Sequence, residues 1–114
     1  MPTLDLADET YVAVPPSVLA PELTAPALLA AWFPSLSFQV FMDRGAKGTR
    51  WSVTGEVEGS AEVWLEPMGR GTLVHWFLRG EPSDGRDDVG NYLDSLNARM
   101  FMFKDDAEAR HLEP

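Results

Sequence analysis

The sequence predicts a single α+β domain in which a long C-terminal helix lies across an antiparallel sheet. The 114 residues are enough for one core of ordinary size and too few for two. Hydrophobic residues make up 45% and charged residues 24% of the chain, a balance typical of a globular domain. The middle of the chain alternates apolar and polar residues, whereas the last third repeats apolar residues every three or four positions.

The alternation predicts a meander of antiparallel strands. A first strand is expected over residues 9–14, because Pro15 and Pro16 after it cannot donate ladder hydrogen bonds. Residues 1–8 and 111–114 are expected to fray. Further strands are expected over residues 37–42, 49–56, 60–67 and 72–80. Glycine-containing segments predict the turns between them, at residues 43–48, 58–60 and 68–71.

Helices are expected on both sides of the meander. Thr24 has the side chain of an N-cap for a short helix over residues 25–32, with Pro26 in its first turn. A helix just after Ser17 has weaker support, because Pro21 would sit where an intrahelical donor is expected. From Asp87 or Asp88 onward, the apolar spacing predicts one amphipathic helix of about 23 residues. It repeats through Val89, Tyr92, Leu93, Leu96, Met100, Phe103 and Ala107.

Residues 100–103 of that helix are apolar around its whole circumference. A turn of this kind is expected to be covered on two sides, once by the sheet and once by another surface. Self-association through this turn, giving a homodimer, is therefore a hypothesis.

Charge and composition exclude several classes of function. Nine Lys and Arg against eighteen Asp and Glu give a net charge of −9, which disfavours binding to nucleic acid. The absence of Cys excludes disulfides, thiolate metal sites and cysteine nucleophiles. The first residues lack the pattern of a secretion signal, and the apolar stretch at residues 26–33 is far shorter than the roughly 20 residues of a membrane span. We therefore expect a cytoplasmic protein without a membrane span.

Few residues have the chemistry of a catalytic centre. His75 and His111 are the two histidines, and His111 lies close to a terminus. Neither a Gly-x-Ser-x-Gly segment nor the usual spacing of metal ligands occurs, so we expect no metal and no cofactor.

Six segments of the chain resemble a known family. They are residues 14–18 (VPPSV), 31–36 (AWFPSL), 44–55 (RGAKGTRWSVTG), 62–67 (EVWLEP), 75–79 (HWFLR) and 104–110 (KDDAEAR). Together they resemble actinobacterial members of the polyketide cyclase/dehydrase group of the START-like (Bet v 1-like, SRPBCC) superfamily. The resemblance implies a helix-grip fold, in which a seven-stranded sheet wraps round the C-terminal helix and encloses an apolar cavity. This chain predicts a shortened form, with about five strands.

The resemblance implies binding of a small apolar or amphipathic ligand, lipid-like or polyketide-like, between sheet and helix. The residues assigned to this cavity are Trp51, Val53, Val63, Leu65, Phe77, Leu96, Met100 and Phe103. The last strand leaves two choices open: either Leu73, His75, Phe77 and Arg79 point inward, or Val74, Trp76 and Leu78 do. We favour the first, because it places one polar group among apolar neighbours, as in ligand pockets.

Catalysis is a further expectation from the resemblance. A cyclase or dehydratase would use Arg50 or Arg79 to polarise a carbonyl and His75 to move a proton. The alternative is a non-catalytic protein-interaction module or homodimer without a usable cavity.

Overall fold

The computed structural model describes residues 4–82 and 89–111, and within them it has the predicted fold class. The strands are β1 (Leu4–Val12), β2 (Leu36–Asp43), β3 (Gly48–Gly55), β4 (Val57–Met68) and β5 (Gly71–Pro82). The helices are α1 (Pro16–Leu23), α2 (Pro26–Trp32) and α3 (Val89–His111), with a short 3-10 turn at Gly45–Lys47. The predicted caps Asp87 and Asp88 lie outside the described residues.

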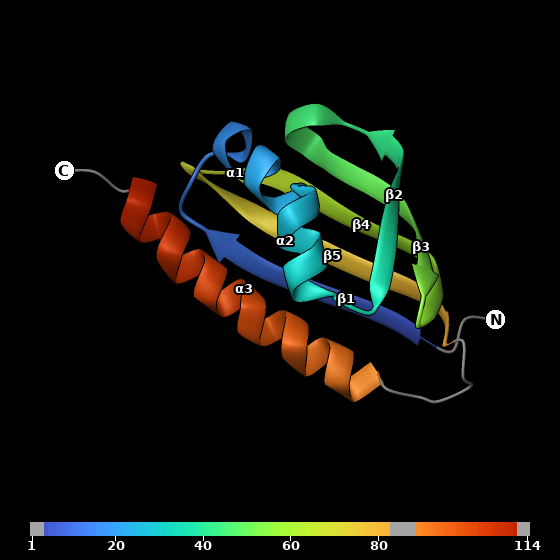
Figure 1. Ribbon diagram of the computed structural model, residues 1–114. Helices are drawn as coiled ribbons and strands as arrows, with labels where there is room; N and C mark the ends of the chain where they lie inside the picture. Colours follow the sequence, from blue (N-terminus) through green and yellow to red (C-terminus); the bar gives the residue numbers. More distant parts are fainter. Residues whose placement is uncertain (1–3, 83–88, 112–114) are drawn as a thin grey trace.

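The five strands form one antiparallel sheet in the order β1-β5-β4-β3-β2. All three helices lie on the same face of this curved sheet, and α3 runs along β1 at one edge of it (Figure 1). We call this the covered face and the opposite one the open face. None of the described helices is long and apolar enough to cross a bilayer. The cytoplasmic location stays a prediction.

The first strand begins earlier than the sequence analysis expected. Residues 4–8 were predicted to fray, but β1 pairs with β5 from Leu4, opposite Gly80, to Val12, opposite Thr72. Leu4 and Leu6 are buried on the covered face, while the acidic residues between and after them face solvent. The strand forms because β5 is long enough to pair with all of it. At the other end His111, also predicted to fray, is the last residue of α3.

Thr24 has a different role from the one predicted. It ends α1 instead of capping α2, and its hydroxyl donates a hydrogen bond of 2.7 Å to the carbonyl of Ala20. The N-cap of α2 is Ala25, which makes no side-chain cap. Pro21 is accommodated within α1, since in a helix this short it removes a single intrahelical bond, to Ser17.

The reversal between β3 and β4 was placed wrongly. The predicted turn at residues 58–60 lies inside β4, and the chain reverses instead at Gly55, whose φ is 109°. Gly59 faces Gly80 across the sheet, and a Cβ on Gly59 would come within 2.0 Å of the carbonyl oxygen of Arg79. Gly59 is therefore required for close approach of two strands and does not mark a turn.

The register between β4 and β5 reverses the face assignment favoured from the sequence. Met68 pairs with Gly71, so the loop contains only Gly69 and Arg70. This sets Leu65 opposite Val74 and Val63 opposite Trp76. A shift of one residue moves every side chain to the other face. Trp76 thus belongs to the covered face, and His75, Phe77 and Arg79 lie on the open face.

The C-terminal half of α3 is fixed to the end of β1 by Lys104 and Glu108. Lys104 Nζ donates to the carbonyl of Tyr11 at 2.8 Å and lies 2.7 Å from Glu108 Oε2. The same carboxylate accepts a hydrogen bond of 2.9 Å from the backbone N–H of Ala13. The bond from Lys104, followed by that from Ala13, lowers the pKa of Glu108 below its usual 4.5. The helix is thereby held along the sheet at this end.

Candidate functional site

Aromatic rings occupy the space between sheet and helices where the resemblance implies a cavity. Trp51 and Trp76 stack with ring centroids 5.9 Å apart and planes 10° apart. Trp32 lies 6.1 Å from both Trp76 and Phe103. Phe33 and Phe38 continue the cluster, and Phe38 meets Trp51 edge-on at 5.6 Å. These contacts pack the centre of the covered face with side chains, and smaller hollows of about 200 and 320 Å³ border the cluster.

Seven of the eight residues assigned to the cavity are part of this core. Each is at most 9% exposed: Trp51, Val53, Val63, Leu65, Leu96, Met100 and Phe103. The structure therefore places them together in the hydrophobic core, and their role in ligand binding stays a prediction. Trp76 Nε1 is buried and has no hydrogen-bond partner among the described residues.

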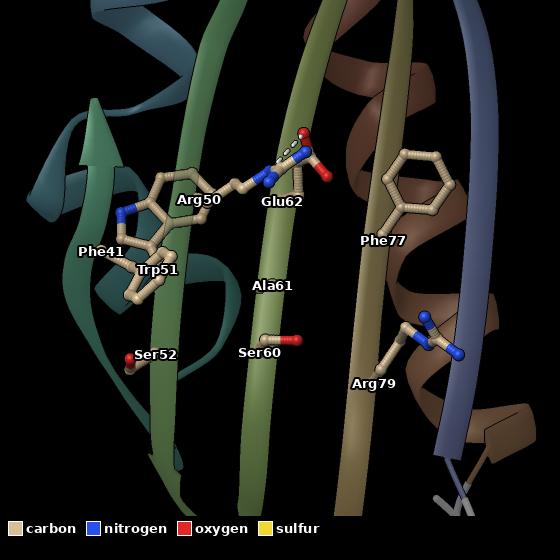
Figure 2. Close-up of a pocket in the computed structure, with 9 residues that line it drawn as sticks. All are labelled: Phe41, Arg50, Trp51, Ser52, Ser60, Ala61, Glu62, Phe77 and Arg79. Carbon is tan, nitrogen blue, oxygen red and sulfur yellow. Dashed lines mark ion pairs between the residues drawn. The ribbon is translucent and has the colours of Figure 1, made fainter. Parts of the chain in front are cut away.

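Polar residues gather instead on the open face, in rows that cross the sheet. One row runs from Arg50 on β3 through Glu62 on β4 to Phe77 on β5. The next row runs from Ser52 through Ser60 to Arg79. Residues two apart on a strand are separated by about 7 Å, so the two rows are neighbours. Figure 2 shows them one above the other, with α3 behind the sheet.

These rows form a hollow on the open face. Its volume is about 580 Å³. The small side chains of Ser52 and Ser60 form the floor of the hollow. The larger side chains of Arg50, Phe77 and Arg79 lie beside them on the same face (Figure 2). The complete lining is Phe41, Arg50, Trp51, Ser52, Ser60, Ala61, Glu62, Phe77 and Arg79. We call this the open-face hollow.

Each arginine of the hollow is held by a carboxylate through Nε. Arg50 Nε lies 3.1 Å from Glu62 Oε2, and Arg79 Nε lies 3.3 Å from Asp5 Oδ1. Within the described part of the chain, the Nη groups of these two residues make no other ion pair or hydrogen bond. Both guanidinium groups therefore keep donors available for a ligand.

Three arginines are paired with two carboxylates beside the hollow. Glu62 Oε2 also accepts from Arg44 Nη1 at 2.9 Å, so one carboxylate serves two arginines. With Arg79 and Asp5 included, the group holds three cations and two anions. The arginines offer local positive charge to an anionic group, although Glu58 and Glu81 face each other two residues further along β4 and β5.

His75 lies beside the hollow and is enclosed by aromatic and acidic side chains. Its ring stacks on Trp64 at 4.2 Å and lies parallel to Phe77 at 6.4 Å. Nε2 is 3.1 Å from Glu66 Oε1, and Nδ1 is 3.6 Å from Glu9 Oε2. These neighbours leave it only 9% exposed although no helix covers this face. No group of three or more His, Asp or Glu side chains in the described residues could hold a metal ion.

Of the three residues assigned to catalysis, the structure brings two into one hollow and places the third next to it. Arg50 and Arg79 line the hollow together with Phe77, which was expected inside the domain. Phe41, Ser52, Ser60 and Glu62 also line the hollow, and none of them was predicted as a site residue. A turn placed at Gly55 would have found three of them, because it sets Arg50 opposite Glu62 and Ser52 opposite Ser60.

Comparisons with known proteins support the fold. No protein-family model matches the chain, and no curated protein matches it in sequence. Among solved structures, DR_A0006 from Deinococcus radiodurans is 18% identical with a TM-score of 0.71, over 92% of this chain and 97% of that one. The Aha1 dimer from Colwellia psychrerythraea is 15% identical with a TM-score of 0.71, over 90% and 94%. CalU16 from Micromonospora echinospora is 16% identical with a TM-score of 0.62, over 90% and 82%.

Sequence identities this low are evidence for a shared fold and for nothing further. The similarity covers most of each chain, including the curved antiparallel sheet and the C-terminal helix. It agrees with the resemblance found in the sequence. The chain has the START-like (Bet v 1-like, SRPBCC) helix-grip fold, in a form with five strands.

Proposed function

We propose that this domain binds a small amphipathic carboxylate in the open-face hollow. The observation that carries the proposal is the placement of Arg50 and Arg79 at diagonal corners of a serine-floored hollow, with the Phe77 ring beside them (Figure 2). Because packed aromatic rings occupy the interior, the open face is the better place for the ligand.

The chemistry of the lining favours this class of ligand. A carboxylate accepts two parallel hydrogen bonds from a guanidinium group, the geometry that arginine presents best. The serine hydroxyls can donate or accept beside it. Phe77 and Phe41 supply apolar surface for the rest of the molecule.

The proposal assigns binding and no reaction to this site. His75 is held against Glu66 and between two rings, and it does not line the hollow. Charge stabilisation of a cyclisation or dehydration transition state is strongest where water is excluded, and an uncovered sheet face offers little exclusion. Cyclase or dehydratase activity therefore has no support beyond the resemblance.

Changing Arg79 to glutamine should weaken binding of 2-naphthoate, used as the probe, about five- to tenfold, because the substitution removes one charge-assisted hydrogen-bonding group. Titration calorimetry or NMR gives the dissociation constant. Arg70→Gln is the matched control, since Arg70 is exposed in the β4–β5 loop and removes the same charge away from the hollow. Equal weakening by both variants would mean that only net charge matters, and the proposed site would be wrong.

Self-association is a second candidate function, favoured by a different observation. Val40, Phe41 and Met42 on β2 are 60%, 70% and 44% exposed. Contiguous exposed apolar residues of this kind mark interaction surfaces. One solved structure of the same fold is that of a dimer, the Colwellia Aha1 protein, which supports homodimerisation here without specifying the interface.

A further inference from the structure

The free edge of β2 is a strand edge protected by a single bulge. β2 ends the strand order and pairs with β3 alone among the described strands (Figure 1). Natural proteins blunt such edges with charged side chains, prolines or bulges. This edge has one bulge, at the register shift between Val40 and Met42, and it carries three exposed large apolar side chains in a row. Exposed backbone donors and acceptors together with apolar side chains are what another strand needs for pairing.

Charge indicates which partner the edge can accept. A second copy of this chain also has a net charge of −9, so two copies repel each other over most of their surfaces. Residues 36–43 contain a single acid, Asp43, and Arg44 and Arg50 follow nearby. Few acids of the two copies would therefore lie close together in a contact at this edge.

We infer that a second copy docks here, β2 against β2, antiparallel and related by a two-fold axis near Phe41. This arrangement places Val40 opposite the partner's Met42 and brings each apolar run against its own image. Such an isologous contact closes after two copies and leaves no further edge of this kind exposed. It joins the two five-stranded sheets into one continuous sheet.

The inference specifies the interface for the proposed self-association and rests on that second candidate function. It is independent of the ligand proposal, although the two surfaces touch. Phe41 lines the open-face hollow and also lies on the free edge, so a second copy would stand beside the hollow.

The test compares two lysine substitutions at exposed phenylalanines. Phe41→Lys introduces a charge at the proposed centre of the interface, and Phe101→Lys does the same on the outward side of α3, where Phe101 is 65% exposed. We expect sedimentation equilibrium to show a dimer for the natural chain and for Phe101→Lys. For Phe41→Lys the dissociation constant should rise about thirtyfold or more, as for other central interface residues. Circular dichroism and a thermal melt show that each variant folds.

The possible outcomes distinguish self-association in general from the β2 interface in particular. Loss of the dimer in Phe101→Lys with retention in Phe41→Lys would place the interface on α3, so the β2 inference would fall and self-association would stand. A natural chain that stays monomeric at millimolar concentration would overturn both. A dimer that survives both substitutions would likewise overturn the β2 inference.

Discussion

Replacing Trp76 with alanine should lower the free energy of unfolding by about 3–5 kcal/mol. Trp76 is 2% exposed, and its ring contacts Trp32, Phe33 and Trp51. Removing it leaves a cavity at the centre of the aromatic cluster that the surrounding rings can only partly close. Its Nε1 has no partner in the described residues, so the loss is one of packing and not of a hydrogen bond. Urea unfolding followed by circular dichroism measures the change.

The same variant should acquire a binding property that the natural chain lacks. A buried apolar cavity of this kind admits a small aromatic molecule, so indole should bind inside the Trp76→Ala protein and restore part of its stability. Trp64→Ala is the control, because Trp64 lies half-buried on the open face and its removal opens no space in the core. If indole stabilises the natural chain as much as the variant, the interior of the natural chain has space for a ligand. The cavity between sheet and helix that the resemblance implies would then be supported.

Gly48→Ala should lower stability by about 3 kcal/mol or more. Gly48 has a φ of 113°, which L residues rarely adopt. In addition, a Cβ at this position would lie 1.9 Å from the backbone carbonyl oxygen of Val63, which pairing within the sheet holds in place. Both effects act at the start of β3, two residues before Arg50, so we also expect a displaced arginine in any molecules that fold.

Gly45→Ala separates the effect of a positive φ from the effect of the steric contact. Gly45 also has a positive φ, of 61°, but a Cβ there would meet no atom within 4 Å. Its substitution should cost only about 1 kcal/mol, the penalty of the left-handed backbone alone. Thermal unfolding of both variants provides the comparison. Equal stability of the two would show that the close approach of Gly48 to β4 does not restrict the side chain.

The helices and strands could be predicted from the sequence because hydrophobic periodicity identifies an element even when its cap or its turn is assigned to the wrong residue. The three- and four-residue spacing from Val89 to Ala107 identifies α3 whatever its cap, and alternation identifies the strands. Gly59 was predicted to mark a turn, because a glycine at a turn and a glycine at a close strand contact look alike in sequence. Only the facing residue, Gly80, distinguishes them, and that pairing is a property of the folded sheet.

The site was harder to predict because it depends on register. One residue of loop length between Met68 and Gly71 decides whether His75 and Phe77 or Val74 and Trp76 face the helices. Arg50 and Arg79 were expected to be catalytic residues, as the resemblance implies, but their position on the uncovered face follows from strand pairing alone. The serine floor carries no sequence motif, so cross-strand geometry was needed to find it.

An NMR titration of the labelled natural chain with 2-naphthoate tests the central claim most directly, that a ligand binds on the open face and not in the interior. We expect shifts of the backbone amides of Ser52, Ser60 and Arg79, with the indole Nε1–H signal of Trp76, which does not line the hollow, unchanged. A shift of the Trp76 indole signal while the open-face amides stay in place would contradict binding on the open face, and so would the absence of any shift at millimolar probe.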